Sequence, residues 1–336
     1  MSESKIRIGI LGSGSMGSEH AGCYGSIASV EVAGVFSRDR ERASVAARIC
    51  GAKPTTDAMA LIDDPAIDAI DICVPSADHS QFVVAALKAG KHVFCETPFA
   101  LANDDARAMI DAAREAKRIL MVGLLMRSIA QYQHIHRAAA SGEHGQLLSV
   151  TTYRLGSYLR PGAPDHKPHY SDPSTELMTF DFDFIQWLMG LPVRIGATGV
   201  DTERGTPGEI SAVLDYEGAQ SATVLASGIM PKSFPFSAGF RVVFEHGAFE
   251  LKNVFEAGPP KSEFLFYPDD GAPRLVEVVG ANPYETELRL FVDAIRGAAD
   301  PDLLDAQHAM KALSMSIATQ RSLRERRAID LPPGTL

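Results

Sequence analysis

The sequence contains no stretch of about 18 uninterrupted apolar residues, the length that a membrane-spanning helix requires. Its first residues, MSESKIRIGI, lack the charged-then-apolar pattern of a signal peptide, so we expect a cytoplasmic protein. Cysteine is scarce, and no two cysteines have the C-x-x-C spacing of a zinc finger. All of them lie in apolar segments, and we expect reduced, buried thiols at Cys23, Cys50, Cys73 and Cys95.

Positive charge is outnumbered as well. The chain has 32 Lys and Arg residues against 42 Asp and Glu residues, a formal net charge of −10. Because that balance repels a phosphate polymer, we do not expect nucleic acid as a partner. Hydrophobic residues make up 46% and charged residues 22%, which predicts a folded core rather than disorder. At about 150 residues per domain, 336 residues predict two domains or one large one.

Apolar runs and amphipathic helical stretches alternate along residues 6–122. The predicted strands are Ile6–Leu11, Val30–Phe36, Asp68–Val74, Lys91–Cys95 and Ile119–Val122. The predicted helices are Ser15–Ile27, Arg40–Ile49, His79–Ala89 and Asp104–Ala116. This rhythm is typical of βαβ units, so we predict an N-terminal α/β domain with a parallel sheet over residues 1–124.

Residues 125–336 have a different pattern. After a predicted helix at Ile129–Ala140, the predicted strands are Leu147–Leu159, Val193–Val200, Glu209–Tyr216, Gln220–Ile229, Gly239–Glu245, Ala248–Lys252, Glu263–Tyr267 and Leu275–Val279. Two predicted hairpin turns, Glu217-Gly218 and His246-Gly247, favour antiparallel pairing. Helices over Tyr284–Arg296 and Asp305–Arg324 close the chain. We therefore predict a C-terminal α+β domain with an open, mostly antiparallel sheet.

One glycine-rich segment indicates function. It fits G-x-G-x-x-G, follows the first predicted strand and opens the first predicted helix, and it consists of Gly12, Ser13, Gly14, Ser15, Met16 and Gly17. Gly12 permits the tight turn, Gly14 lets a pyrophosphate approach the backbone, and Gly17 lets the helix lie close to the sheet. Free N–H groups at the start of the helix bind the anion. The segment predicts a Rossmann-type dinucleotide site.

The end of the second predicted strand bears on the choice of dinucleotide. Twenty residues after Gly17 stands Ser37, where an NAD-preferring site usually carries Asp or Glu. Arg38 follows, and a guanidinium grips a 2′-phosphate bidentately when no carboxylate repels it. The pair favours NADP over NAD. The alternative is that Arg38 stacks on the adenine and discriminates little between the two.

Further segments form a characteristic set along the chain. They are GSGSMG followed by His20, Ser37-Arg38-Asp39, DAIDICVP with His79 after Pro75, KHVFCETP, VGLLMR ending at Arg127, FDFDFIQWLMG, EHGAFEL, YETELRLFVDAIRG and DAQHAMKALSMSIATQRS. In this combination the chain resembles the Gfo/Idh/MocA family (glucose–fructose oxidoreductase, inositol dehydrogenase and relatives). The likeness spans nearly its whole length.

The resemblance implies a Rossmann domain, a second domain with an open sheet, and homo-oligomers that use the outer face of that sheet. It also implies NAD(P)-linked oxidation or reduction of a small-molecule substrate: a sugar, a polyol or a related hydroxy compound. By position, the glycine segment lines the pyrophosphate, while Ser37 and Arg38 line the adenosine ribose. The remaining cofactor positions that the resemblance implies are Val74, Pro75, His79, Glu96 and Thr97.

Two positions depart from the family's pattern. The lysine of its E-K-P signature, which contacts the nicotinamide ribose and the reacting oxygen, is Thr97 here, and its catalytic histidine falls on Phe180. The acid four residues before that histidine is Glu176, and Asp183 fills a second acid position. A positioned acid or base contributes about 10²–10⁴-fold to such a reaction. Either another group replaces the missing pair, or the protein is not a working polyol dehydrogenase.

Candidate replacements lie in the second predicted domain. Glu176 is a candidate base if Met178 and Phe180 desolvate it and raise its pKa; otherwise it is a salt-bridged helix acid. The polar loop RPGAPDHKPHYSDP is either a lid over the nicotinamide or a solvated surface loop. The catalytic candidates are thus Glu176, Thr97, His169 and Tyr170, and the substrate-binding candidates are Arg127, Arg154, Lys167, Glu176, Phe180 and Asp183.

The sequence leaves three hypotheses. The first is an NAD(P)-dependent oxidoreductase with an altered proton-transfer set, in which the two arginines bind a substrate carboxylate or phosphate unless they are structural ion-pair partners. The second is a catalytically weak or inactive relative that binds NADP(H) or a metabolite as a sensor. The third is a redox enzyme that retains its cofactor through several cycles. No His, Asp or Glu spacing predicts a metal site.

Overall fold

The computed structural model describes residues 4–163, 172–218, 220–256 and 260–331. The chain forms two compact units. The first contains Met1–Ser128 together with Gly280–Met310, and the second contains Ile129–Val279 together with Lys311–Leu336. The division expected at residue 124 differs from this one, because it assigned the segment from Gly280 to Met310 to the second domain. Within the described residues, no helix is long and apolar enough to cross a membrane.

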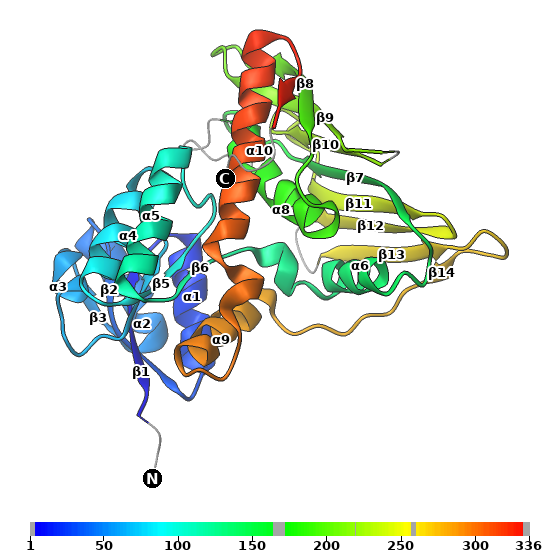
Figure 1. The fold of residues 1–336 in the computed structure, drawn as a ribbon. Coiled ribbons are helices and arrows are strands. Elements are labelled where there is room, and N and C mark those ends of the chain that lie inside the picture. Colours follow the sequence, from blue (N-terminus) through cyan, green and yellow to red (C-terminus); the bar gives the residue numbers. More distant parts are fainter. Residues whose placement is uncertain (1–3, 164–171, 219, 257–259, 332–336) are drawn as a thin grey trace. The chain divides into compact units, whose positions relative to one another are not determined.

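The first unit is built on a six-stranded sheet whose strand order is β3-β2-β1-β4-β5-β6, with every paired strand parallel (Figure 1). Its strands are β1 (Ile6–Leu11), β2 (Val30–Phe36), β3 (Lys53–Thr55), β4 (Ala69–Ile72), β5 (His92–Cys95) and β6 (Leu120–Val122). The main helices are α1 (Ser15–Ser26), α2 (Arg40–Cys50), α3 (Met59–Ile62), α4 (His79–Lys88) and α5 (Asn103–Ala116). The predicted parallel sheet is confirmed. Its strand order reverses between β1 and β4, where such folds bind ligands.

A late segment of the chain completes this unit. Helix α9 (Pro283–Ile295) buries the apolar side chains of Leu288, Phe291 and Val292. The ring of Phe291 packs against Phe94 of β5, with ring centroids 5.6 Å apart. The apolar periodicity of α9 predicts a buried face, but it does not say which sheet that face covers. This contact shows that α9 packs on the six-stranded sheet of the first unit.

The second unit contains a nine-stranded sheet in the order β14-β13-β12-β11-β7-β10-β9-β8-β15. Its strands are β7 (Leu147–Leu155), β8 (Arg194–Asp201), β9 (Pro207–Asp215), β10 (Ser221–Ser227), β11 (Phe236–Phe244), β12 (Gly247–Phe255), β13 (Lys261–Tyr267), β14 (Arg274–Leu275) and β15 (Ile329–Asp330). Among the described strands of this sheet, only β7 and β10 pair in parallel. The predicted open, mostly antiparallel sheet is confirmed, although β14 is shorter than the predicted strand there.

Helices cover the sheet of the second unit. They are α6 (Ala130–Ser141), the short α7 (Pro173–Glu176), α8 (Met178–Met189) and α10 (Ala306–Glu325), which continues from the first unit. Aromatic rings form the core between them, and Tyr132 of α6 lies 4.6 Å from Phe184 of α8 and 5.0 Å from Phe240 of β11, measured between ring centroids. This core fixes α8, which carries several of the candidate residues.

Candidate functional site

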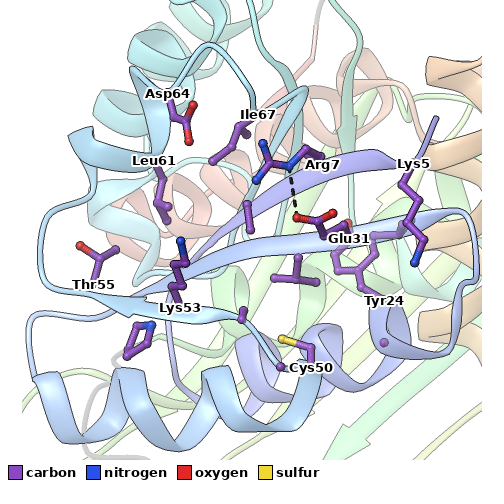
Figure 2. Close-up of a pocket in the computed structure, with 17 residues that line it drawn as sticks. Lys5, Arg7, Tyr24, Glu31, Cys50, Lys53, Thr55, Leu61, Asp64 and Ile67 are labelled. Atoms are coloured by element: carbon purple, nitrogen blue, oxygen red, sulfur yellow. Dashed lines mark hydrogen bonds and ion pairs between the residues drawn. The ribbon is translucent and has the colours of Figure 1, made fainter.

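One hollow of the first unit lies away from the glycine segment. It has a volume of about 640 Å³ and lies where β1, β2 and β3 begin, with Lys5, Arg7, Glu31 and Lys53 among its lining residues (Figure 2). Arg7 is already paired with Glu31 at 3.3 Å. In open parallel sheets, ligands bind at the carboxyl ends of the strands. The opposite edge of the sheet, where the glycine segment lies, is therefore the candidate site.

The three glycines of the segment differ in what a Cβ atom would contact at each position. Gly12 has φ +130°, and a Cβ there would lie 2.4 Å from the carbonyl oxygen of Cys73. A Cβ on Gly17 would lie 2.2 Å from the carbonyl oxygen of Gly12. By contrast, apart from the adjoining backbone, no atom of the described residues lies within 4 Å of the Cβ position of Gly14. Gly12 and Gly17 thus allow the chain to pack, while Gly14 leaves open space beside the turn.

That open space adjoins an uncapped helix. Gly14 is the N-cap of α1, it supplies no side-chain cap, and the first turn carries no acidic residue. The first amides of a helix have no intrahelical acceptor, and they face the positive end of the helix dipole. An anion is their natural partner. The arrangement fits the diphosphate of a dinucleotide, with the amides at Ser15, Met16 and Gly17 as donors.

The end of β2 forms the next part of the site. Ser37 is half-buried and Arg38 is exposed, and Arg38 has no hydrogen bond or ion pair with the described residues. The Asp39 carboxylate is engaged as the cap of α2, where it accepts from the amides of Glu41 and Arg42. A depression of about 320 Å³ lies beside them, lined by Ser13, Asp39, Glu41, Arg42 and Val45. Arg38 is therefore a cation without a described partner at the carboxyl end of β2.

The loop after β4 is held by a buried histidine. The Nε2 atom of His79 lies 2.9 Å from the carbonyl oxygen of Val74, and its Nδ1 atom lies 3.3 Å from that of Phe99. Burial lowers the pKa of His79. The side chain is only 1% exposed, so its ring ties together the loops that follow β4 and β5. Its predicted role along the cofactor stays a prediction, as do those of Val74 and Pro75.

The loop after β5 carries Glu96 and Thr97. The Thr97 amide donates to Glu96 Oε2 at 3.0 Å, and the peptide bond between Thr97 and Pro98 is cis. The Glu96 side chain is 12% exposed. The Thr97 hydroxyl is buried and has no hydrogen-bond partner among the described residues. A buried hydroxyl in this position is suited to bind a ligand atom.

Glu176 ends α7 in the second unit. Burial, together with the nearby Asp172 carboxylate, raises the pKa of Glu176 to about 7. Asp172 itself is occupied, because it accepts from the Ser174 amide at 2.8 Å and from Gln320 Nε2 at 3.1 Å. Glu176 has no ion pair within the described part of the chain, so the alternative of a salt-bridged acid finds no partner there.

The candidate arginines are used inside the fold. Arg154 pairs with Asp181 at 2.9 Å, and its guanidinium carbon lies 5.1 Å from the centre of the Phe180 ring. Arg127 is 1% exposed and donates to the carbonyl oxygen of Leu303. These contacts match the ion-pair and structural alternatives more closely than a free substrate-binding role. The three loop candidates lie outside the described residues: Lys167, His169 and Tyr170.

Comparisons with known proteins agree with this geometry. Residues 6–124 match an oxidoreductase family with an NAD-binding Rossmann fold, and residues 132–250 match the Gfo/Idh/MocA C-terminal domain. The chain belongs to the Gfo/Idh/MocA family. Its first unit is accordingly a nicotinamide-dinucleotide-binding Rossmann domain, with the choice between NAD and NADP open.

Several known proteins match nearly the whole chain. A 4-carboxy-2-hydroxymuconate-6-semialdehyde dehydrogenase from Sphingobium sp. is 33% identical, over 94% of this chain and 100% of its own. A D-xylose 1-dehydrogenase (NADP(+)) from Haloferax volcanii is 27% identical over 97% of this chain and 100% of its own. The solved structure of a UDP-N-acetylglucosamine 3-dehydrogenase from Acidithiobacillus ferrooxidans aligns with 96% of this chain and 99% of its own, with a TM-score of 0.81 and 22% identity. At this identity the likeness shows that the fold is shared.

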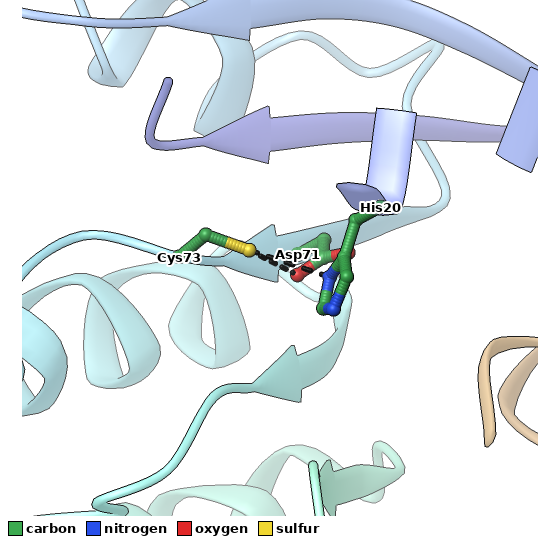
Figure 3. A group of neighbouring side chains, drawn as sticks. All are labelled: His20, Asp71 and Cys73. Atoms are coloured by element: carbon green, nitrogen blue, oxygen red, sulfur yellow. Dashed lines mark hydrogen bonds and ion pairs between the residues drawn. The ribbon is translucent and has the colours of Figure 1, made fainter. Parts of the chain in front are cut away.

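One cluster in this Gfo/Idh/MocA chain was not predicted. His20 Nδ1 donates to Asp71 Oδ2 at 2.8 Å, and Cys73 Sγ lies 3.2 Å from Asp71 Oδ1 and 3.3 Å from His20 Nδ1 (Figure 3). Cys73 is thus a free thiol as expected, but its surroundings are polar rather than apolar. The signal in the sequence was Asp71, a carboxylate inside the fully buried strand β4, which requires a polar partner.

The cluster continues toward the cofactor side of the sheet. His20 Nε2 lies 2.9 Å from Glu96 Oε1. Although burial opposes the charged form, the Asp71 carboxylate and the Cys73 thiol raise the pKa of His20 well above its ordinary value. His20 therefore lies between two carboxylates, one inside β4 and one in the loop after β5.

Proposed function

We propose that this protein is an NAD(P)-dependent oxidoreductase that transfers a hydride between a nicotinamide cofactor and the CH–OH group of a sugar, a polyol or a related hydroxy compound. The observation that carries the proposal is the open space at Gly14 beside the uncapped start of α1. The names of the relatives support it, since they describe dehydrogenases of D-xylose, of a nucleotide sugar and of a carboxylated semialdehyde.

The proton-transfer set is part of the proposal. Thr97 and Phe180 stand where the family's lysine and histidine are expected, so the hydroxyl proton needs another acceptor. Glu176 fits that role, because a pKa of about 7 lets one carboxyl group both accept and release a proton near neutral pH. The unpartnered Thr97 hydroxyl supplies a hydrogen bond to the cofactor or to the reacting oxygen.

The cofactor supplies the hydride chemistry, and the chain supplies binding and orientation. The amides at the start of α1 would hold the diphosphate, and the loops after β4 and β5 would border the nicotinamide half. In the second unit, His169, Tyr170 and Lys167 remain candidates to close over the substrate. Phe180 and Asp183 remain candidates to shape the substrate pocket from α8.

We further propose a preference for NADP. Arg38 is exposed and uncommitted, Ser37 offers no negative charge, and the Asp39 carboxylate is occupied at the cap of α2. A charge-assisted hydrogen bond to phosphate is worth about 1.5–3 kcal/mol. These residues together favour a 2′-phosphate over a free ribose hydroxyl.

The Arg38→Ala variant tests this preference. We expect its Kd for NADPH to rise by about tenfold to a hundredfold, and its Kd for NADH to change less than about twofold. Titration of protein fluorescence with each nucleotide measures both constants. Arg48→Ala, which removes an exposed arginine from the other end of α2, is the matched control. Equal weakening of both nucleotides would indicate stacking on the adenine instead.

Isothermal titration calorimetry with NAD(H) and NADP(H) tests the function itself. It is followed by assays on sugars, polyols and hydroxy acids, including carboxylated compounds. Binding with turnover on one of these classes is the expected result. Tight binding without turnover on any of them would favour the sensor hypothesis, and no heat with either nucleotide would refute both.

Sedimentation velocity tests the homo-oligomer that we propose through the outer face of the nine-stranded sheet.

A further inference from the structure

A fully buried acid lies next to Glu96 without a hydrogen-bond partner. Glu287 of α9 is 0% exposed, and neither of its carboxylate oxygens forms a hydrogen bond within the described residues. One of these oxygens, one Glu96 oxygen and one ring nitrogen of His20 all lie within 4.8 Å of one another. Burying an ionised carboxylate without a partner is strongly unfavourable. Glu287 therefore requires either a proton or a cation.

Charge counting does not separate these two states. With a protonated His20, ionised Asp71 and Glu96, and a neutral Glu287, the group carries a net charge of −1. A divalent cation on a neutral His20 and three ionised carboxylates gives the same −1. The proton state holds two more protons than the metal state, one on His20 and one on Glu287.

The distances favour the proton. His20 Nδ1 is hydrogen-bonded to Asp71 Oδ2 at 2.8 Å, and Nε2 lies 2.9 Å from Glu96 Oε1 as an ion pair without hydrogen-bond geometry. A carboxylate oxygen beside each ring nitrogen favours the imidazolium over the neutral ring. A metal ligand would need a free lone pair on Nε2, where the Glu96 contact already lies. Glu287 then needs its own proton, with the Glu96 carboxylate as the adjacent acceptor.

We propose that Glu287 is a positioning residue that retains a proton and donates it in a hydrogen bond to Glu96. Together with His20, this bond fixes the Glu96 carboxylate, and Glu96 Oε2 in turn holds the Thr97 amide. The Thr97 hydroxyl is thereby kept in place for a ligand. The role of this clamp in cofactor binding rests on the proposed function, whereas the proton on Glu287 does not.

The electrostatic surroundings agree with a neutral Glu287. Burial, followed by the Glu96 carboxylate, raises the pKa of Glu287 well above its ordinary value, and the His20 imidazolium opposes this only in part. Asp71 acts in the same direction as Glu96. Other titratable groups of the described residues interact with Glu287 or with its neighbours in the cluster, among them Cys23, Tyr24, Cys73, His79, Cys95 and Tyr284.

Infrared difference spectroscopy on the folded protein tests the proton directly. At pH 8 the wild type is expected to show the C=O stretch of a buried carboxylic acid, and Glu287→Gln to lack that component. Glu285→Gln is the matched control, since Glu285 lies on the same helix and pairs with Arg289. Absence of the band, its persistence in Glu287→Gln, or a stoichiometric divalent metal in the purified wild type would overturn the proposal.

Nucleotide affinity tests the positioning role. Glu287→Gln keeps a donor toward Glu96, so we expect its Kd for the preferred dinucleotide to remain within about twofold of wild type. Glu287→Ala removes the donor, and we expect a Kd at least about tenfold higher. Unchanged affinity in a folded Glu287→Ala would overturn this role. If Glu287→Ala does not fold, equal loss of affinity in Glu287→Gln and Glu287→Leu is the overturning result. If the wild type binds no dinucleotide, the proposed function is refuted. The infrared band still shows whether Glu287 is protonated.

Discussion

Replacing Gly14 by valine will remove dinucleotide binding and leave the fold intact. The new side chain enters the open space beside the turn, where nothing in the described part of the chain beyond the adjoining backbone lies within 4 Å of the Cβ position. It therefore collides with a bound diphosphate and not with the protein. We expect the Kd for NADPH and NADH to rise by at least about a hundredfold, equivalent to about 2.8 kcal/mol, in calorimetric titrations.

Thermal unfolding supplies the control for Gly14→Val. Gly14 has φ −74° and ψ −164°, a conformation that valine adopts without strain, so only about 1 kcal/mol of capping preference is lost. Gly17→Ala is the matched contrast, because its Cβ would lie 2.2 Å from the carbonyl oxygen of Gly12 and should cost about 2 kcal/mol or more. Unimpaired nucleotide binding in Gly14→Val would show that the anion lies elsewhere.

The sequence predicts the elements of the two sheets because their burial follows simple patterns. Strand β1 and strand β4 are short apolar runs, and the predicted hairpin turns at Glu217-Gly218 and His246-Gly247 do join antiparallel neighbours. The three-residue strand β3 was missed, since Lys53–Thr55 is mostly exposed and contains a proline. Such a strand forms because β2 offers it an edge, and no local pattern records that edge.

The sequence predicts the candidate site only where a single continuous segment forms it. The proposed diphosphate contacts come from the backbone of one segment, so spacing along the chain was sufficient to predict them. The cluster around His20 combines α1, β4, the loop after β5 and α9, and its members Glu96 and Glu287 are far apart in sequence. Nothing near Glu287 in the chain indicates that its carboxyl group meets a second carboxyl group. That fact arises only when α9 packs on the first sheet.

The Glu176→Gln variant should show the largest effect on catalysis. Glutamine has the same size but cannot accept the hydroxyl proton, so we expect kcat to fall by about 10²–10⁴-fold with little change in nucleotide affinity. For the wild type, the rate of alcohol oxidation should rise with pH through about 7 as Glu176 ionises. In the variant this rise should be absent. Turnover within about threefold of wild type would assign the proton to another group.

The same substitution has an opposite effect on stability. The pKa of Glu176 is about 7 in the folded protein and 4.5 ordinarily, so the folded state binds more protons between these values. The stability that protonation of Glu176 provides is full below about pH 4.5 and is lost as the pH rises through about 7. Glutamine avoids that loss, and at pH 8 Glu176→Gln should be more stable than wild type by up to about 3 kcal/mol. Urea unfolding at pH 5 and pH 8 measures the difference, with the exposed Glu217→Gln as control. A variant that gains stability while losing turnover would show that the fold tolerates this buried carboxylate for its chemistry.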